Sequence, residues 1–472
     1  MDQIMDFLLS AVKTVNAYLS DYILIILLVG TGLFYTIKTR FVQIRCFGEG
    51  MKRVFGGFSL FGKKHKGGLS SFQALATAIA AQVGTGNIVG ACGAILIGGP
   101  GAIFWMWVIA FFGMATIYAE AVLAQETREI HEDGTVSGGP VYYIKKAYKG
   151  KFGKFLAGFF AVAITLALGF IGAMVQSNSI AQTSGTAFGI EPWIIGLIIA
   201  AVSAFIFIGG IQRIASVAEK IVPIMAVLYI LIGLIVLCIN FKNVPEAFAL
   251  IFKYAFAPQA IIGGSVGAAI KAAISQGAKR GLFSNEAGMG STPHAHAMAN
   301  VEKPHDQGVA AMIGVFIDTF IVLTMTALVV ITTLYTNGGV LADGLQTGEM
   351  LNGVEITNAN LMQLALSQVF GSTIGNILIA ICLMFFAFTT IIGWNFFGKI
   401  NFQYLFGKKA TIIYSIVSVA FIFLGSLFKN DLVWELADMF NNLMVIPNVL
   451  AIVPLFAIVV AASKSNQNKL KK

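Results

Sequence analysis

The residues best suited to do chemistry lie in a break within an apolar segment, where residues 82–87 read Gln-Val-Gly-Thr-Gly-Asn. An apolar helix is predicted before the break over residues 72–81, and a second apolar run follows it. Two glycines separated by one residue are poor helix formers. Inside a membrane, the backbone groups that such a break frees are tolerated only when they are buried in protein or line a wet cavity. Freed N–H groups can hold an anion and freed C=O groups a cation, although a glycine-packed helix contact is the alternative.

A second glycine-rich interruption occurs in the apolar segment of residues 263–300, where residues 281–290 read Gly-Leu-Phe-Ser-Asn-Glu-Ala-Gly-Met-Gly. Lys279 and Arg280 directly precede this stretch, and Glu286 lies within it. Ionisable groups at membrane depth are costly and are usually paired or functional. We therefore hypothesise that these three charges stabilise the unwound backbone or gate it. Two further acidic residues are predicted at membrane depth, Glu120 and Asp318.

The composition indicates a polytopic helical membrane protein. Hydrophobic residues make up 57% of the chain and charged residues 11%, and the mean hydropathy is +0.83, whereas soluble domains carry roughly 25% charged residues. Many apolar runs exceed the roughly 20 residues that span a bilayer, and the alternation typical of a membrane β-barrel is absent. The net charge of +9 lies mostly in loops, so it indicates topology and not nucleic-acid binding.

Basic loops indicate on which side of the membrane each predicted span begins and ends. Residues 38–66, 128–154 and the tail are rich in Lys and Arg, whereas the loop 336–360 has acidic residues but no Lys or Arg. The positive-inside rule therefore predicts a protein of the cell membrane with about eleven spans, an external N-terminus and a cytoplasmic C-terminus. A short surface helix is expected within residues 241–259 on the outer side.

Each break is followed by four more predicted spans. A unit of five spans begins and ends on opposite sides of the membrane, so the two halves have opposite orientations. This arrangement is an inverted-topology repeat, in which the binding site lies between the two halves. The predicted organisation is an N-terminal segment with an extra span (1–66), a first five-helix half (67–240), an external connection (241–262), a second five-helix half (263–463) and a tail (464–472).

These motifs resemble the alanine/glycine:cation symporter family. The resemblance rests on residues 83–88, on the Gly-Gly-Pro-Gly-Ala-Ile-Phe-Trp-Met-Trp run of residues 98–107 and on residues 283–288, supported by residues 137–140 and 393–394. It covers nearly the whole chain. It implies an all-α LeuT-type fold of five plus five helices with one extra N-terminal helix. It also implies sodium-driven import of alanine or glycine by alternating access, without enzymatic activity.

The resemblance implies a substrate site between the breaks. A zwitterionic amino acid needs N–H donors for its carboxylate, acceptors for its ammonium group and a small apolar pocket, for which two aromatic side chains are expected walls. Because an extra methylene costs only about 1–3 kcal/mol in such a pocket, serine would be only weakly excluded. The expected substrate contacts are Gly84, Thr85, Gly86, Gln176, Phe283, Ser284, Asn285 and Trp394. Two alternatives to substrate contact stay open. Gln176 and Asn178 could instead form hydrogen bonds between helices, and the aromatic residues could face lipid or pack in the core.

The resemblance also implies a sodium site. There, the adjacent hydroxyls of Thr389 and Thr390 face the end of the helix that precedes the first break. Sodium prefers hard oxygen ligands, and backbone carbonyls are freed just before the break. The expected Na⁺ ligands are Ala80, Val83, Phe386, Thr389 and Thr390. The alternative is that the threonine hydroxyls bond back to their own helix.

Proton coupling is the main alternative to sodium coupling. In some LeuT-type carriers an amine on the fifth core helix replaces sodium, and Lys220 lies on that predicted helix. Lys220 is near the cytoplasmic end beside Glu219, however, so a pair at the inner rim is favoured. A channel is disfavoured by the inverted repeat, and no GxxxxGK[ST] loop for nucleotide binding occurs.

The remaining metal-binding residue types suggest no further site. The four cysteines, of which none forms a CxxC pair, are interpreted as buried thiols without a disulfide framework or a metal site. His294 and His296 would point to different faces of a helix, so we expect them on a helix surface near the inner end.

Overall fold

The computed structural model describes residues 2–56, 69–132, 135–256, 266–336, 338–342, 350–351, 354–428 and 430–464. Within these ranges, eight helices are long and apolar enough to cross a membrane, and the bent pair Ser71–Gln82 and Gly86–Gly98 makes a ninth. The chain is therefore a multi-pass membrane protein. Some expectations lie outside the described residues, namely those for residues 57–68, 257–265, 343–349 and 465–472.

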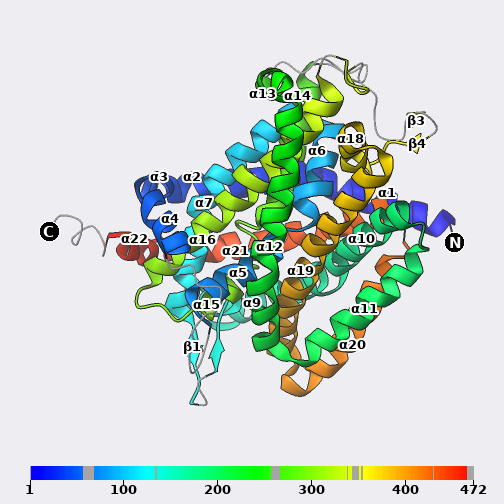
Figure 1. Cartoon of the computed structure of the whole chain (residues 1–472). Coiled ribbons are helices and arrows are strands. Elements are labelled where there is room, and N and C mark those ends of the chain that lie inside the picture. The colour runs from blue at the N-terminus through cyan, green and yellow to red at the C-terminus, as the bar shows by residue number, and fades with distance from the viewer. Residues whose placement is uncertain are drawn as a thin grey trace.

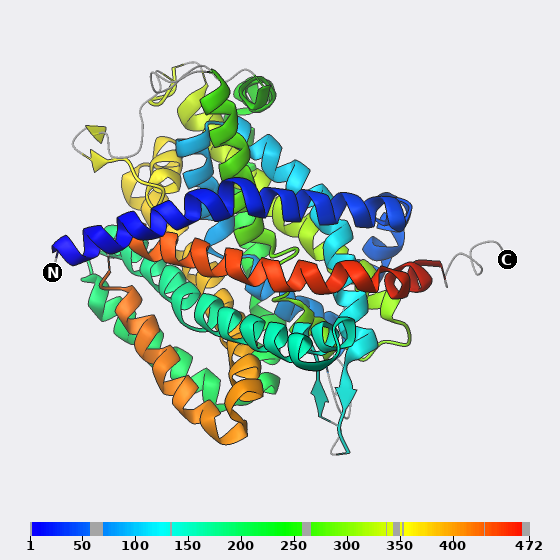
Figure 2. The same ribbon diagram turned by 180° about the vertical axis from the view of Figure 1, so that it is seen from behind.

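The N-terminal segment forms one long rod. It comprises α1 (Asp2–Tyr18), the π-helical η1 (Leu19–Leu24) and α2 (Ile25–Lys38), followed by the short α3 (Val42–Arg45) and α4 (Phe47–Gly56). The rod is longer than the roughly 20 residues that a membrane span requires. Figure 2 shows it beside α21 (Asn430–Ile452), and the Tyr35 hydroxyl donates to the Ile452 carbonyl at 2.6 Å. The extra helix is thus fixed to the last part of the chain.

The first half begins with the broken helix. Ser70 caps α5 with a capping box, in which its hydroxyl accepts from the Gln73 N–H and the Gln73 side chain accepts from the Ser70 N–H. The small β1–β2 hairpin was not anticipated. The elements of this half are α5 (Ser71–Gln82), η2 (Gly86–Gly90), α6 (Ala91–Gly98), α7 (Gly101–Thr127), β1 (Glu129–Ile130), β2 (Val136–Ser137), α8 (Pro140–Ala147), α9 (Gly150–Ile164), η3 (Thr165–Gly172), α10 (Ala173–Phe188), α11 (Pro192–Ile208) and α12 (Gly210–Ile239).

The second half follows η4 (Phe241–Asn243) and α13 (Val244–Phe256), which form the expected surface helix. The β3–β4 hairpin within residues 336–360 and the short helix α18 that follows it were not anticipated. The elements of this half are α14 (Val266–Asn285), α15 (Pro293–Ala297), α16 (Pro304–Val315), η5 (Phe316–Leu323), α17 (Thr324–Val330), η6 (Ile331–Tyr335), β3 (Met350–Leu351), β4 (Val354–Glu355), α18 (Leu361–Phe370), α19 (Ser372–Phe406), η7 (Lys408–Ala410), α20 (Thr411–Gly425), α21, η8 (Val453–Leu455) and α22 (Phe456–Lys464).

The broken helix occupies the centre of the molecule. All residues from 74 to 96 are buried, because α5 packs against α12, α15, α16 and α19 while α6 packs against α14. In Figure 1, by contrast, α11 and α20 lie side by side at the lower right, away from this centre.

The number of spans stays a prediction. Pro192–Ile208 is apolar but only 17 residues long, and the 20-residue α14 includes Lys271, Lys279 and Arg280. Outside the two breaks, the predicted spans are nevertheless helical over most of their length in the described residues.

Candidate functional site

The first break begins where α5 ends. Val83 adopts an extended conformation (φ −78°, ψ 91°), and the chain bends by 47° before the helix resumes at Gly86. The Gly84 N–H donates to Asn87 Oδ1 at 2.9 Å, and the Thr85 N–H donates to Gln176 Oε1 at 3.2 Å. These two N–H groups, expected to be free, therefore donate to side-chain oxygens. An anion would bind them by displacing those oxygens.

Gln176 of α10 is fully buried and contacts this break. Because its Oε1 accepts from the Thr85 N–H, its Nε2 is a donor, and within the described residues this donor has no acceptor. The Thr85 hydroxyl also has no partner there. Leaving a buried polar group unpaired costs about 1–3 kcal/mol, so two neighbouring groups of this kind indicate a place for a polar ligand.

Asn178 forms helix–helix hydrogen bonds, which was the alternative role considered for both Gln176 and Asn178 of α10. Its Nδ2 donates to the Gly425 carbonyl at 2.8 Å and to the Phe428 carbonyl at 2.9 Å. Asn178 thus ties α10 to the end of α20, whereas Gln176 turns to the break.

The second break lies at residues 286–292, between α14 and α15. Glu286 adopts φ +57°, a left-handed conformation that is uncommon outside glycine and often marks a functional site. Phe283 and Ser284 occupy the last turn of α14 rather than the unwound part. Asn285 closes that turn, since its Oδ1 accepts from the Ala287 N–H at 3.1 Å.

The two breaks touch each other. Gln82 Nε2 donates to the Asn285 carbonyl at 2.7 Å. A Cβ atom on Gly86 would lie 2.9 Å from Ser284 Cα and 3.1 Å from Phe283 Cδ1, so only glycine allows this approach. The residues predicted around a shared substrate site are therefore brought together from both halves.

The two predicted aromatic walls pack against each other. Phe283 and Trp394 meet edge to face with 5.5 Å between ring centroids. Both are buried, with exposed fractions of 2% and 1%, which excludes the lipid-facing alternative. Trp394 Nε1 also donates to Glu286 Oε1 at 2.5 Å, so the indole links α19 to the second break.

The expected cation ligands also come together. Thr390 Oγ1 lies 3.1 Å from the Ala80 carbonyl, 3.5 Å from the Val83 carbonyl and 3.1 Å from the Phe386 carbonyl. Thr389 Oγ1 instead donates within its own helix, 2.9 Å from the Phe386 carbonyl. Back-bonding, the alternative for both hydroxyls, thus occurs at Thr389 and at Thr390. Thr390 additionally reaches from α19 to the end of α5.

The three predicted gating charges have separate partners. Lys279 pairs with Asp21 at 3.5 Å and Arg280 with Asp438 at 3.1 Å. Glu286 accepts hydrogen bonds from Trp394 and from the Ser291 hydroxyl. The cations therefore fix α14 to η1 and α21, and only Glu286 belongs to the break itself.

Sequence reasoning missed a buried network that joins the breaks. Asp318 of η5 accepts from Asn87 Nδ2 at 2.6 Å through Oδ1 and from the Ser284 hydroxyl at 2.9 Å through Oδ2. Asn87 belongs to the first break and Ser284 precedes the second. The signal was present, since an asparagine in the break and an aspartate at membrane depth both need polar partners.

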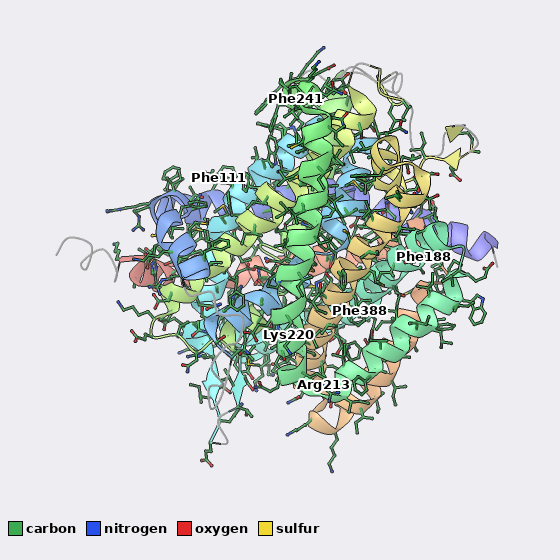
Figure 3. The ribbon with its side chains drawn as sticks, viewed as in Figure 1. Phe111, Phe188, Arg213, Lys220, Phe241 and Phe388 are labelled. Atoms are coloured by element: carbon green, nitrogen blue, oxygen red, sulfur yellow. The ribbon has the colours of Figure 1, made fainter. Side chains whose placement is uncertain are left out.

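Lys220 lies on the surface of α12 (Figure 3) and is exposed, whereas its neighbour Glu219 is buried and accepts from Gln73 Nε2 at 3.0 Å. The inner-rim pair of Lys220 and Glu219 is not formed. The α12 residues that face Thr389 include Ile214 and Ala218, which line a narrow gap with it, and Met225, whose Sδ lies 3.5 Å from its hydroxyl. The Lys220 amine therefore does not reach the threonine pair.

Two sequence interpretations need correction. His294 and His296 are fully buried and not on a helix surface, because His294 stacks on Phe397 with 5.6 Å between ring centroids and His296 pairs with Gln307. Among the cysteines, Cys238 is exposed on α12 while the other three are buried.

Comparison with known proteins was made on sequence and on structure. The profile of the sodium:alanine symporter family matches residues 5–472. The sodium/alanine symporter AgcS of Methanococcus maripaludis is 41% identical over 470 residues, covering 99% of both chains. The putative sodium/proton-dependent alanine carrier protein YrbD of Bacillus subtilis is 40% identical over 98% of this chain and 93% of its own. The probable sodium/glutamine symporter GlnT of Bacillus subtilis is 38% identical over 100% and 92%.

The fold is similar to that of a solved transporter. The crystal structure of MhsT in complex with L-phenylalanine superposes with a TM-score of 0.59 at 15% identity, covering 85% of this chain and 98% of that one. This likeness concerns the fold alone, and it confirms the expected all-α LeuT-type architecture.

Proposed function

The chain belongs to the sodium:alanine symporter family, and we propose that it imports alanine or glycine together with Na⁺ by alternating access. The two halves, residues 67–240 and 263–463, would rock about a site between their broken helices. The proposed orientation has the N-terminus outside the cell membrane and the C-terminus in the cytoplasm.

One observation carries the substrate site. Gln176 Nε2 and the Thr85 hydroxyl are buried beside the first break without a partner among the described residues. Both can donate a hydrogen bond, as can the N–H groups of Gly84, Thr85 and Gly86, so this side suits the carboxylate of an amino acid. A carboxylate here would satisfy the two side-chain groups and recover their desolvation cost.

The second break would hold the other end of the substrate. The carbonyls of Phe283 and Ser284 are among the last four of α14, which have no helical N–H partner, and they suit an ammonium group, with the Asn285 side chain close by. The Phe283 and Trp394 rings would face the substrate side chain. Two rings packed against each other would limit the substrate side chain to hydrogen or methyl, which favours glycine and alanine over glutamine.

Sodium is proposed to bind where Thr390 meets the end of α5. The carbonyls of Ala80, Val83 and Phe386 surround its hydroxyl, and oxygen atoms of this kind are the ligands that a hard cation prefers. The Thr389 hydroxyl is next to them and would turn from its own helix to complete the set.

Proton coupling remains the second candidate, and one observation favours a different group for it than Lys220. Asp318 is buried between the breaks and forms no ion pair with any described residue. A carboxylate held only by neutral donors can take up a proton or a cation. Glu120 and Glu286 are likewise buried and held by neutral donors, but Asp318 bonds to both Asn87 and Ser284. We therefore propose Asp318, rather than the exposed Lys220, as the titratable residue of this second mechanism.

The test is uptake of labelled L-alanine into proteoliposomes that contain the purified protein. Uptake that requires an inward Na⁺ gradient, and that glycine inhibits, would support the proposal. Uptake driven by a proton gradient without Na⁺ would refute sodium coupling and support proton coupling through Asp318. Uptake of glutamine but not of alanine or glycine would refute the assignment of the Phe283–Trp394 wall.

A further inference from the structure

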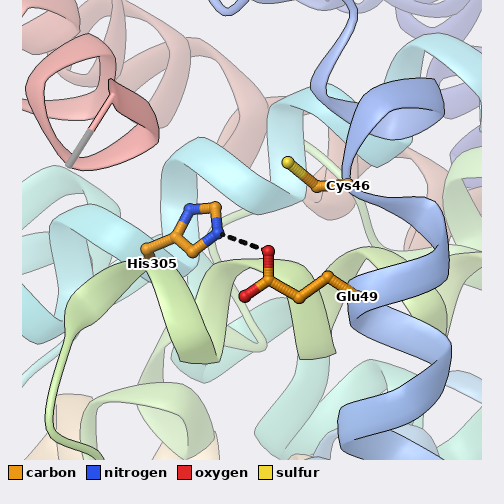
Figure 4. A group of neighbouring side chains, drawn as sticks. All are labelled: Cys46, Glu49 and His305. Atoms are coloured by element: carbon orange, nitrogen blue, oxygen red, sulfur yellow. Dashed lines mark hydrogen bonds and ion pairs between the residues drawn. The ribbon is translucent and has the colours of Figure 1, made fainter. Parts of the chain in front are cut away.

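A cysteine, a glutamate and a histidine meet at the end of the N-terminal rod, outside the site described above (Figure 4). Cys46 joins α3 to α4, Glu49 lies in the first turn of α4, and His305 is the second residue of α16. The helices approach closely at Gly50, where a Cβ atom would lie 2.9 Å from the Val309 carbonyl. The fold therefore brings together residues separated by more than half of the chain.

The donor atoms are positioned for one small cation. One ligand atom from each of the three residues lies within 4.8 Å of the others, and His305 Nε2 is 3.3 Å from Glu49 Oε2. Zinc bonds of about 2.0–2.3 Å place tetrahedral ligands about 3.3–3.8 Å apart, so side-chain movements of about 1 Å complete the geometry. Cys46 and His305 are buried, while the Glu49 side chain is 24% exposed, which leaves an entry path and room for a water ligand.

The surroundings hold these side chains in place. Tyr118 of α7 has its hydroxyl 2.7 Å from His305 Nδ1, the outer hydrogen bond that metal-binding histidines usually make. Arg53 binds Glu49 Oε1 at 3.1 Å, which leaves Oε2 directed to His305.

We propose that Cys46, Glu49 and His305 form a binding site for a divalent transition metal, with Zn²⁺ as the fitting ion. A thiolate, an imidazole and a carboxylate are the donors found in protein zinc sites, and a water would occupy the fourth position. Binding releases the Cys46 thiol proton to solvent. The metal would fasten α4 of the N-terminal segment to α16 of the second half. This proposal does not depend on the transported substrate.

The test uses Co²⁺ as a coloured probe of the purified full-length protein after treatment with a chelator. We expect one Co²⁺ per chain with a thiolate-to-cobalt charge-transfer band, which Zn²⁺ abolishes by displacement. Cys46→Ser should remove the band, and His305→Gln should weaken metal binding about tenfold or more. Tyr118→Phe should weaken it about tenfold through the lost outer hydrogen bond. Cys238→Ser, which changes an exposed thiol elsewhere, should leave both band and affinity unchanged.

A second measurement guards against misfolded variants. Zn²⁺ should raise the melting temperature of the native protein and of Cys238→Ser, because a ligand that binds only the folded state stabilises it. The absence of a thiolate band in the native protein would overturn the proposal without any variant. A band that persists in Cys46→Ser would also overturn it, and the cluster would then be only the hydrogen-bonded contact of His305 and Glu49.

Discussion

Replacing Gly84 by alanine should weaken sodium dependence through a single added methyl group. The new Cβ atom would lie 2.3 Å from Thr390 Oγ1, so the hydroxyl must retreat by about 1 Å, at the cost of about 1–3 kcal/mol that overpacking carries. Its contacts with the Ala80 and Phe386 carbonyls, both 3.1 Å, would lengthen with it. If this cost falls on the sodium-bound state, the apparent affinity for Na⁺ drops about 5- to 150-fold.

The assay is the Na⁺ concentration that gives half-maximal alanine uptake in proteoliposomes. Gly158→Ala is the matched control, since Gly158 lies in α9 with nothing within 4 Å of an added Cβ, and it should transport normally. The double variant Gly84→Ala/Thr390→Ala removes the 2.3 Å contact but keeps those of 3.1 Å to the residue 390 Cβ and 3.2 Å to Gln176 Oε1. Its thermal stability should therefore recover in part while sodium dependence stays impaired. Native sodium affinity in Gly84→Ala would refute the cation site at Thr390.

Three further outcomes follow from charged residues, two of them buried (Glu286 and Arg280) and one exposed (Lys220). Glu286→Gln should abolish most transport in a folded protein, because the carboxylate accepts from the Trp394 indole and the Ser291 hydroxyl; native uptake would contradict its role in the break. Arg280→Met should lower the free energy of unfolding by about 3–5 kcal/mol by leaving Asp438 buried and unpaired, and adding Asp438→Leu should restore the melting temperature if the pair is only structural. Lys220→Met should leave the response to Na⁺ and proton gradients unchanged, and a lost proton response would reinstate that lysine.

The sequence predicted the architecture because membrane helices are governed by local rules. Length and apolarity identify the spans, and glycine pairs mark where a helix cannot continue, so the break after Gln82 lies where it was expected. The second break was less well placed, because Phe283 and Ser284 remain helical in α14. Tertiary hydrogen bonds, such as that from Gln82 to the Asn285 carbonyl, determine where the unwinding begins.

Only the tertiary structure showed which residues distant in the chain contact each other. Neighbouring threonines are alike in sequence and both bond back to their own helix, yet only Thr390 also reaches α5. The same holds for Asn87, whose bond to Asp318 joins segments 231 residues apart.

By itself, the sequence determined the membrane location, the two glycine breaks and the family resemblance, since these depend on composition and on spacing along one helix. Only the tertiary structure decided that His294 is buried against Phe397 and that Cys46 meets His305. Helical periodicity states which residues share a face, but it does not state which other helix covers that face. That choice depends on how all the helices pack together.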